Sequence, residues 1–237
     1  MRDTDPGDRT PRSRSTAKTL PASILPADRG AQSGSHPRRH SKSQLRWERI
    51  VKSAIALFNE RGFAATSMQD ISDHVGLQKG SLYYYVKSKE MLLFEILRDL
   101  HHGGEALVAA VNFETSDPVS ELRAFLVQIC MYAGRHSDRL GIFARDFHFL
   151  EEKQQREIIS ERYVYRSATE RLIQSAIDRK QVSSAIHAAS AAQSIIQAAA
   201  GIYEWFRTGG SLTIEQVAVQ TAQLQVLGLT AYPHPDR

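Results

Sequence analysis

The stretch TSMQDISDHVGLQKGSLYYYVKSK, residues 66–89, decides the fold of this 237-residue chain. Thr66 and Gln69 have the T-x-x-Q spacing of a capping box, which predicts that a short helix begins at Thr66. Gly76 interrupts the apolar pattern and supplies the backbone conformation that a tight turn between helices requires. A second short helix follows this turn, so the stretch predicts a helix-turn-helix.

The pattern GLQKGSLYYYVKSKE, residues 76–90, follows TSMQDIS and a helix that ends in F-x-x-x-G-F from Phe58 to Phe63. Together these motifs resemble the DNA-binding domain of the tetracycline-repressor (TetR) family of bacterial transcription regulators over about residues 45–95. The resemblance implies an all-helical homodimer that binds a palindromic operator and releases it when a small molecule enters the C-terminal domain. Tyr85 and Val86 depart from the His-Phe of many members, which affects the base contacts but not the fold.

The second helix of the motif carries side chains that suit contacts with double-stranded DNA. Lys79 suits a guanine edge or a phosphate, and Gln78 and Ser81 suit hydrogen bonds to bases or backbone. Tyr83 and Tyr84 suit phosphate contacts through their hydroxyls and packing against thymine methyls.

The remaining predicted DNA contacts depend on the resemblance. Gly80 costs about 1 kcal/mol relative to alanine within a helix, and in the family a DNA phosphate or base edge approaches the backbone here. The resemblance also implies contacts by Ser67 and Tyr85, and a phosphate clamp at Lys89. Alternatively, Tyr83 or Tyr85 packs beneath the helix and does not contact DNA, and this alternative stays open.

A first helix is predicted from Ser43 to Arg61, with Gly62 as its C-cap. Its polar face carries Arg46, Arg49 and Lys52. These three cations either are simply solvated or include a phosphate contact. A fourth helix, about Lys89–Val111, begins at the Ser88 cap, and the resemblance implies that it links the two domains and tilts when ligand binds.

The N-terminal arm, residues 1–42, carries nine Lys or Arg against four Asp and five of the eight prolines. It has few large apolar side chains, so we expect it to be disordered. Either it is a solvated extension, or Arg38, Arg39 and Lys42 reach DNA phosphates or a minor groove. The only proline between residues 43 and 232 is Pro118, which predicts that this part is all-α.

The predicted organisation is therefore an arm at residues 1–42, a three-helix helix-turn-helix DNA-binding domain at 43–90, a larger ligand-binding and dimerisation domain at 91–232, and a tail at 233–237. In the larger domain Asp117 is expected to cap a helix that begins with Pro118. Further helices are predicted over LGIFARDFHFLEE, residues 140–152, and from about Gln154 to Lys180.

The last two helices are predicted to form a dimer interface. The segment SSAIHAASAAQSIIQAAAGIYEWFR, residues 183–207, is dense in small side chains that allow helices to approach closely. Gly209 and Gly210 are expected to stop it, and Thr213 with Gln216 forms a capping box for the final helix. A single-chain core would also tolerate this composition, although a two-fold protein matches a palindromic operator.

The segment from ARDFHFLEE to YEWFRTGGSLTIEQVA also resembles regulators of fatty-acid and steroid catabolism, whose effectors are acyl-CoA thioesters. An apolar pocket for the acyl or ring group is thus expected, with arginines that meet the CoA phosphates. Ordinary core aromatics and surface ion pairs are the alternative roles. The candidate effector-binding residues are Phe143, Arg145, Phe147, Arg162, Arg166 and Tyr203.

Other function classes find little support. The single cysteine, Cys130, excludes a disulfide framework and is expected to be a buried thiol. No apolar run suggests a membrane span, so the chain is expected to be cytoplasmic. Asp146 and His148 with Glu151 and Glu152 form no catalytic motif, so no enzyme activity, metal or cofactor is expected. A DNA-binding activator or architectural protein without a ligand stays open as the alternative function.

Overall fold

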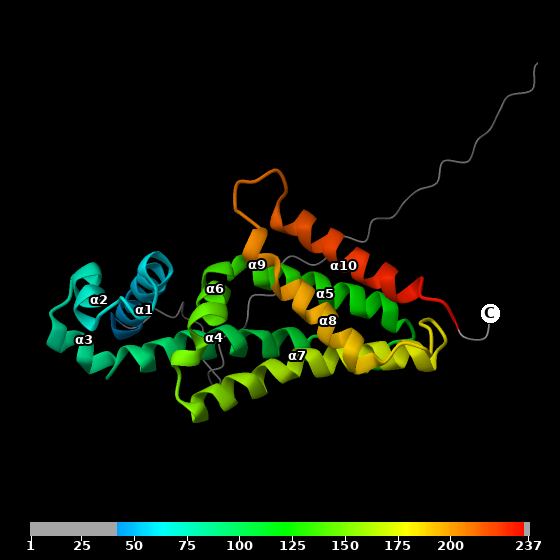
Figure 1. Ribbon diagram of the computed structural model, residues 1–237, viewed down its shortest axis with the longest axis horizontal. Helices are drawn as coiled ribbons and strands as arrows, with labels where there is room; N and C mark the ends of the chain where they lie inside the picture. Colours follow the sequence, from blue (N-terminus) through cyan, green and yellow to red (C-terminus); the bar gives the residue numbers. More distant parts are fainter. Residues whose placement is uncertain (1–41, 235–237) are drawn as a thin grey trace, which may run out of the picture. The chain divides into compact units, whose positions relative to one another are not determined.

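The computed structural model describes residues 42–234, and every regular element in that part of the chain is helical (Figure 1). The predicted all-α fold is confirmed for these residues. The predicted arm lies outside the described residues except for Lys42, and so do residues 235–237 of the tail. The elements are α1 (Lys42–Arg61), α2 (Met68–Val75), α3 (Lys79–Tyr85), α4 (Lys89–Ala109), α5 (Pro118–Arg135), α6 (Ser137–Asp146), the 3-10 helix η1 (Phe147–Phe149), α7 (Glu152–Asp178), α8 (Ala188–Ala200), α9 (Ile202–Trp205) and α10 (Ile214–Thr230).

The helix-turn-helix has the predicted turn but a different first cap. Gly76 ends α2 in the left-handed conformation, with φ of 74°, as expected. The prediction that Thr66 and Gln69 form the capping box is wrong: Ser67 accepts from the Asp70 backbone, and Asp70 accepts from the Ser67 backbone at 2.8 Å. Thr66 is buried and its hydroxyl donates to the Gly62 carbonyl instead, so it closes the loop before α2.

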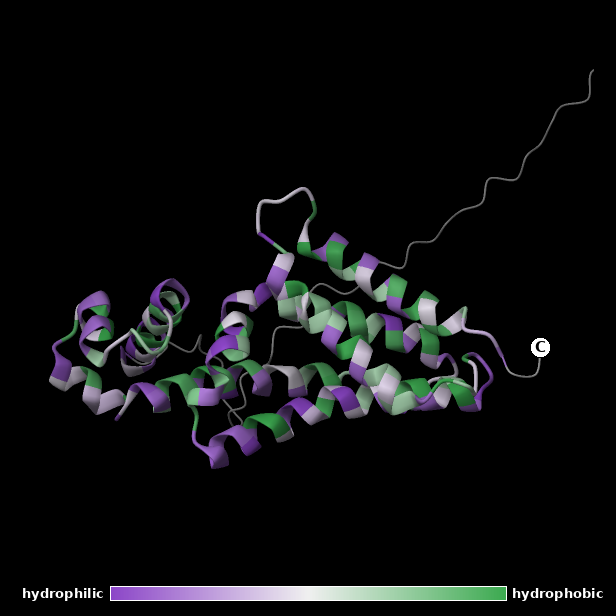
Figure 2. Ribbon diagram, in the orientation of Figure 1, coloured by the Kyte–Doolittle hydropathy of each residue, from purple (hydrophilic) through white to green (hydrophobic). Residues whose placement is uncertain are grey.

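A hydrophobic cluster joins the first three helices to α4. Ile71, Val75 and Leu82 are buried in it, and Phe63 packs edge-to-face on Phe58. Residues of α4, α6 and α7 complete the same cluster, so the helix-turn-helix shares its core with the helices that follow. Figure 2 shows that α1–α3 are more hydrophilic than α5, α8 and α10, in keeping with a small core beneath polar surfaces.

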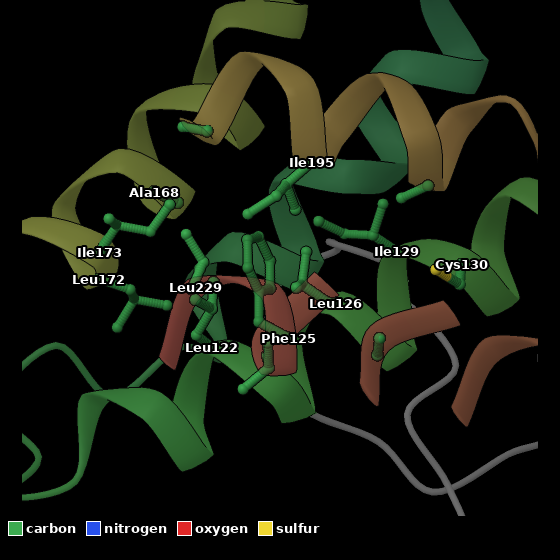
Figure 3. Packing of buried hydrophobic residues seen from close by; sticks show 14 of the residues in the cluster. Leu122, Phe125, Leu126, Ile129, Cys130, Ala168, Leu172, Ile173, Ile195 and Leu229 are labelled. Carbon is green, nitrogen blue, oxygen red and sulfur yellow. The ribbon is translucent and has the colours of Figure 1, made fainter. Parts of the chain in front are cut away.

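The larger bundle is centred on α5. Asp117 caps this helix and Pro118 begins it, as predicted. The inward side chains of α5 meet those of α7, α8 and α10 in one cluster (Figure 3). Cys130 is a free, buried thiol in this cluster, and burial raises its pKa to about 12. The members that Figure 3 labels are Leu122, Phe125, Leu126, Ile129, Cys130, Ala168, Leu172, Ile173, Ile195 and Leu229.

Two predicted helices are shorter than expected. The helix predicted over residues 140–152 ends at Asp146 and is followed by η1, after which Leu150 is extended. The helix predicted over residues 183–207 covers only Ala188–Ala200, and Gly201 separates it from α9. Thr213 and Gln216 form the predicted capping box of α10.

Candidate DNA-binding surface and effector cavity

The polar row of α3 faces away from the protein core. Leu82 is fully buried and holds the helix on the domain, whereas Tyr84 is 81% exposed. Tyr85 is partly buried and packs on the hydrophobic cluster, so it is the tyrosine beneath the helix. The side chain of Tyr83 is exposed. The other predicted contact residues on or beside this helix are exposed, namely Gln78, Lys79, Gly80 and Ser81.

Gly80 has no packing role within the described part of the chain. A Cβ atom built on it would meet no atom within 4 Å, and its φ does not lie in the left-handed region. Neither backbone strain nor a neighbouring side chain therefore requires glycine at this position. The open space above its backbone lies between Lys79 and Ser81, where a second molecule can approach closely.

A shallow groove lies between part of α3 and the start of α2. Its lining includes Ser67, Lys79 and Tyr83, all predicted contacts, and also Lys87, which sequence reasoning missed. The N-terminus of α2 contributes the positive end of a helix dipole, and Lys79 and Lys87 add two ammonium groups. This combination suits a phosphate of the DNA backbone. The sequence signal for Lys87 was its position in the short loop between α3, which ends at Tyr85, and α4, which begins at Lys89.

Lys89 has a structural role in this conformation. Its ammonium group donates to the carbonyl oxygens of Phe63, Ala64 and Thr66 at 2.9, 3.2 and 2.9 Å, and it lies 4.5 Å from the centroid of the Phe63 ring. A lysine has three N–H donors, and these three carbonyls use all of them. Lys89 thus fixes the loop before α2 to the start of α4.

A second region with the character of a binding site is a cavity of about 280 Å³ among α4, α5, α7 and α8. Its walls are mostly apolar and include Leu100, Ile129 and Ile196, with a few polar side chains among them. Such a combination is typical of small-molecule sites. A larger groove between α1 and α4 is lined mainly by charged side chains and lacks this apolar character.

Two glycines on α4 allow tyrosines to reach this helix. Tyr132 of α5 donates to the Leu100 carbonyl at 2.6 Å, and Tyr165 of α7 donates to the His101 carbonyl at 2.7 Å. Cβ atoms built on Gly103 and Gly104 would overlap the Tyr132 and Tyr165 side chains respectively. Burial raises the pKa of both tyrosines, to about 12 for Tyr132, so both hydroxyls remain donors at neutral pH. The pair of glycines inside a helix was a sequence signal that the prediction did not use.

His101 is the most buried polar side chain of the cavity. It is 5% exposed, and its Nε2 atom has no hydrogen-bond partner among the residues that the structure describes. Burial, and secondarily the nearby Arg162 charge, lowers its pKa from 6.5 to about 3. The ring is therefore neutral at physiological pH.

The predicted effector-binding residues divide into two groups. Arg162 and Arg166 line the cavity, and Phe143 supports it, with its ring 5.1 Å from that of His101 and 4.6 Å from the Arg162 guanidinium. Phe147 packs on Phe143 in the cluster shared with the helix-turn-helix, away from the cavity lining. Tyr203 lies in α9, where its hydroxyl hydrogen-bonds to the neighbouring Glu204.

Arg145 connects α6 to α1 instead of lining the cavity. It donates to the Phe58 carbonyl at 2.7 Å and pairs with the buried Asp146 at 2.8 Å. Phe143, two residues earlier on α6, contacts His101 and Arg162, two of the polar side chains in the cavity lining. This short helix therefore touches both the cavity and the last turn of α1.

The outer face of α10 carries apolar side chains that the described chain leaves uncovered. Leu224 is 69% exposed, and Val219 and Leu227 are also exposed. The adjacent α8 presents the small exposed residues Ser190, Ser194 and Ala198 at four-residue spacing. A face of small and apolar residues on two neighbouring helices suits packing against another helix pair.

Other kinds of site find no support within residues 42–234. No group of three or more His, Cys, Asp or Glu side chains in this range is arranged to hold a metal ion. None of its helices combines the length and apolar character that crossing a membrane requires.

Two family models match the chain in succession. Residues 50–96 match "Bacterial regulatory proteins, tetR family", and residues 115–229 match "Tetracyclin repressor-like, C-terminal domain". Among curated proteins, the chain is 29% identical over 198 residues to the HTH-type transcriptional repressor KstR2 of Rhodococcus jostii (strain RHA1). That match covers 81% of this chain and 94% of the relative.

Solved structures show the same arrangement of helices. AibR in complex with isovaleryl coenzyme A and operator DNA matches with a TM-score of 0.66 and 26% identity, over 78% of this chain and 98% of that one. The ketosteroid transcriptional regulator KstR2 of Mycobacterium tuberculosis matches with a TM-score of 0.71 and 24% identity, over 78% of this chain and 95% of that one, which supports the fold.

Proposed function

This chain belongs to the TetR family of bacterial transcription regulators, and on that premise we propose that it is a repressor released from DNA by a small-molecule effector. It binds a palindromic operator as a homodimer, with α3 of each subunit in a major groove. The cavity among α4, α5, α7 and α8 receives the effector. Relatives of this chain are transcription regulators, and we assign it no catalytic step.

The observation that carries the DNA-binding role is the exposed row of α3 around Gly80. The side chains beside this glycine are polar and exposed, and the space above its backbone is open. A surface with Lys79 and Lys87 supplies the charge that phosphates require. The predicted contacts of Gln78, Ser81 and Tyr84 remain part of this proposal.

For the dimer, the exposed faces of α8 and α10 are the proposed interface. Their small and apolar side chains would be covered by the same helices of a second copy, in a two-fold arrangement. The symmetry of such a dimer matches that of a palindromic operator.

An acyl-CoA thioester is the proposed effector class. The cavity offers apolar walls for an acyl or ring group, and Arg162 and Arg166 offer guanidinium groups for anionic oxygens. The bound isovaleryl coenzyme A of AibR supports this class. At about 280 Å³ the cavity suits the acyl part rather than a whole coenzyme A molecule.

Release requires that the effector move the DNA-binding helices. The proposed route uses α4, which contributes to the cavity and begins directly after the helix-turn-helix, and α6, which Arg145 ties to the end of α1. Operator half-sites about 34–36 Å apart accept both α3 helices only at matched spacing. A small tilt of α4 in each subunit would therefore weaken binding.

We further propose that the domains divide at residues 42, 90 and 232, and that Arg38 and Arg39 of the arm contribute to DNA binding. A chain that acts on operator DNA is expected to work in the cytoplasm. The alternative of a ligand-independent activator predicts DNA binding that no metabolite changes.

Selection of bound sequences from a random duplex library tests the proposed DNA-binding role. The proposal expects an enriched palindrome, two subunits per duplex and an affinity that falls steeply with salt. Enrichment of no sequence, or binding by a single subunit, would count against a dimeric operator-binding repressor.

A further inference from the structure

One side chain in the lining of the effector cavity has a buried polar atom that residues 42–234 leave unpaired. His101 is buried on α4, and its Nε2 has no hydrogen-bond partner in the described part of the chain. Buried polar groups are nearly always paired, because an unpaired one loses its hydrogen bonds to water without replacement. Three buried side-chain atoms of the described residues lack a partner, and His101 Nε2 is the one whose side chain lies in the lining of the effector cavity; the other two are Glu161 Oε2 and Gln181 Oε1.

A second group beside His101 also lacks an acceptor. Arg162 lies mainly in the interior, and its guanidinium stacks on the Phe143 ring without an ion pair or a hydrogen bond to any residue of 42–234. The same ring contacts His101 edge-on. Phe143 therefore positions an imidazole and a guanidinium side by side, and both groups line the cavity.

The neighbouring hydroxyls cannot substitute for these two groups. Tyr132 and Tyr165 already donate to main-chain carbonyls of α4. Arginine has only donors, and neutral histidine can donate through Nε2 when that nitrogen carries the proton. The ligand atom that satisfies both groups is consequently an acceptor, because a donor would face the fixed positive charge of Arg162.

We propose that His101 is a specificity-determining residue of the effector site, which binds a compound whose carbonyl or carboxylate oxygen accepts hydrogen bonds from His101 Nε2 and Arg162. This inference rests on the proposed function, since it refines the chemistry of the same cavity. The shared chemistry covers the carboxylate of a free acid and the thioester carbonyl of an acyl-CoA. The apolar wall, which includes Ile129 and Ile196, takes the hydrocarbon part.

The arrangement predicts strong discrimination against compounds that lack the oxygen. An alkyl analogue of the same shape leaves both groups unpaired, and sites built around buried hydrogen-bonding groups reject such analogues strongly. An alcohol oxygen can accept from both groups, but it lacks the carboxylate's charge, and its own O–H brings a third donor to a site that offers only donors. Arg166 stacks on the exposed Tyr163 ring at 4.5 Å, which places a second guanidinium at the cavity edge. That position suits the remainder of a thioester ligand.

The test measures binding of matched probes to the full-length protein by calorimetry and thermal shift. The probes are isovalerate, isovaleryl-CoA, octanoate and octanoyl-CoA, with isoamyl alcohol, octanol and free coenzyme A as comparisons. Wild type should bind an acid or thioester at least tenfold more tightly than the matched alcohol. The acid and thioester arms separate the two sources of the oxygen.

Variants connect this preference to the imidazole. His101→Phe keeps a ring against Phe143 but removes the nitrogen, so it should lose about tenfold in affinity for the oxygenated probe and most of the preference over the alcohol. His101→Gln restores a donor and should recover part of the preference. His102→Phe alters the adjacent, exposed histidine outside the cavity and should bind as wild type does.

Operator binding by the same preparations distinguishes two kinds of failure. If the variants and wild type bind operator equally but no acid or thioester probe binds wild type, the inference is overturned and the proposed repressor function stands. Equal affinity of wild type and His101→Phe for a bound probe would also overturn it. If wild type does not bind any operator sequence, the proposed function itself is contradicted.

Discussion

The Tyr165 ring of α7 occupies the space that a side chain on Gly104 of α4 would fill, and from there its hydroxyl donates to the His101 carbonyl at 2.7 Å. Tyr132 makes the equivalent contact over Gly103. The two tyrosines thus hold α4 against α5 and α7 beside the effector cavity. A ligand that displaces either ring would free the helix that leads to the DNA-binding domain.

Gly104→Ala should therefore disturb this contact. The added methyl overlaps the Tyr165 ring and not only its tip, so the ring must move and its hydrogen bond is lost. Forcing extra volume into a packed site costs about 1–3 kcal/mol, which denaturant unfolding measures. We also expect that a higher effector concentration is needed to release the variant from operator DNA. An unchanged free energy of unfolding would contradict the packing described here.

Gly80→Ala should separate stability from DNA binding. Nothing in the described chain lies near the added methyl, and alanine is the better helix former by up to about 1 kcal/mol. Stability should hold or rise, whereas operator affinity should fall about tenfold because the methyl meets the DNA. Gly141→Ala in α6 is the matched control, since its Cβ would make only an ordinary contact with Asn59. Full operator affinity in Gly80→Ala would argue against close approach of DNA at α3.

Ser67→Ala should cost about 1 kcal/mol of stability at neutral pH, because it removes the cap of α2. The effect should depend on pH. Hydrogen bonds from the Ser67 hydroxyl and backbone lower the pKa of Asp70 below its usual 3.8. Stabilisation from this carboxylate is complete above 3.8 and is lost as the pH falls through its lower folded-state pKa.

Denaturant unfolding of wild type and Ser67→Ala across this pH range checks that expectation. The difference between them should narrow as Asp70 becomes protonated. Thr66→Val, which removes the buried hydroxyl bonded to Gly62, should leave the pH dependence of stability as in wild type. A difference that stays constant down to acidic pH would contradict the assigned capping box.

Leu224→Lys should disrupt the proposed dimer. Leu224 is exposed on the outer face of α10, and a dimer would bury it against the partner, where an unpaired ammonium group is costly. Sedimentation velocity should detect monomers at concentrations where wild type is dimeric, and operator affinity should fall with dimer content. Leu45→Lys, on the exposed face of α1, should sediment as wild type does. A dimeric Leu224→Lys protein would place the interface elsewhere.

Local sequence signals were sufficient for several helix ends. A capping residue affects only the adjacent turn of helix, so its position specifies the helix end directly. The residues of this kind are Gly62, Gly76, Ser88 and the Asp117–Pro118 pair. The cap at α2 was misassigned because Thr66 and Ser67 are both suitable caps with suitable partners three residues later. Only the tertiary structure decides, by burying Thr66 in the loop core.

The effector cavity depends on contacts that the sequence does not reveal. Arg145 and Arg162 look equivalent along the chain, yet one reaches the Phe58 carbonyl, 87 residues away in sequence, and the other lines the cavity. His101 was missed because its unpaired nitrogen arises from packing of three helices. Its neighbours Gly103 and Gly104 were the only local trace of that packing.

Release of operator DNA by an acyl-CoA effector is the central property to measure. Labelled duplex from the region flanking the gene is titrated with wild-type protein, and acyl-CoA esters are then added at fixed salt, with free coenzyme A as the control. We predict sequence-specific binding that one ester reverses in a saturable manner, while coenzyme A has no effect. Specific binding that survives every ester would contradict release by an acyl-CoA effector.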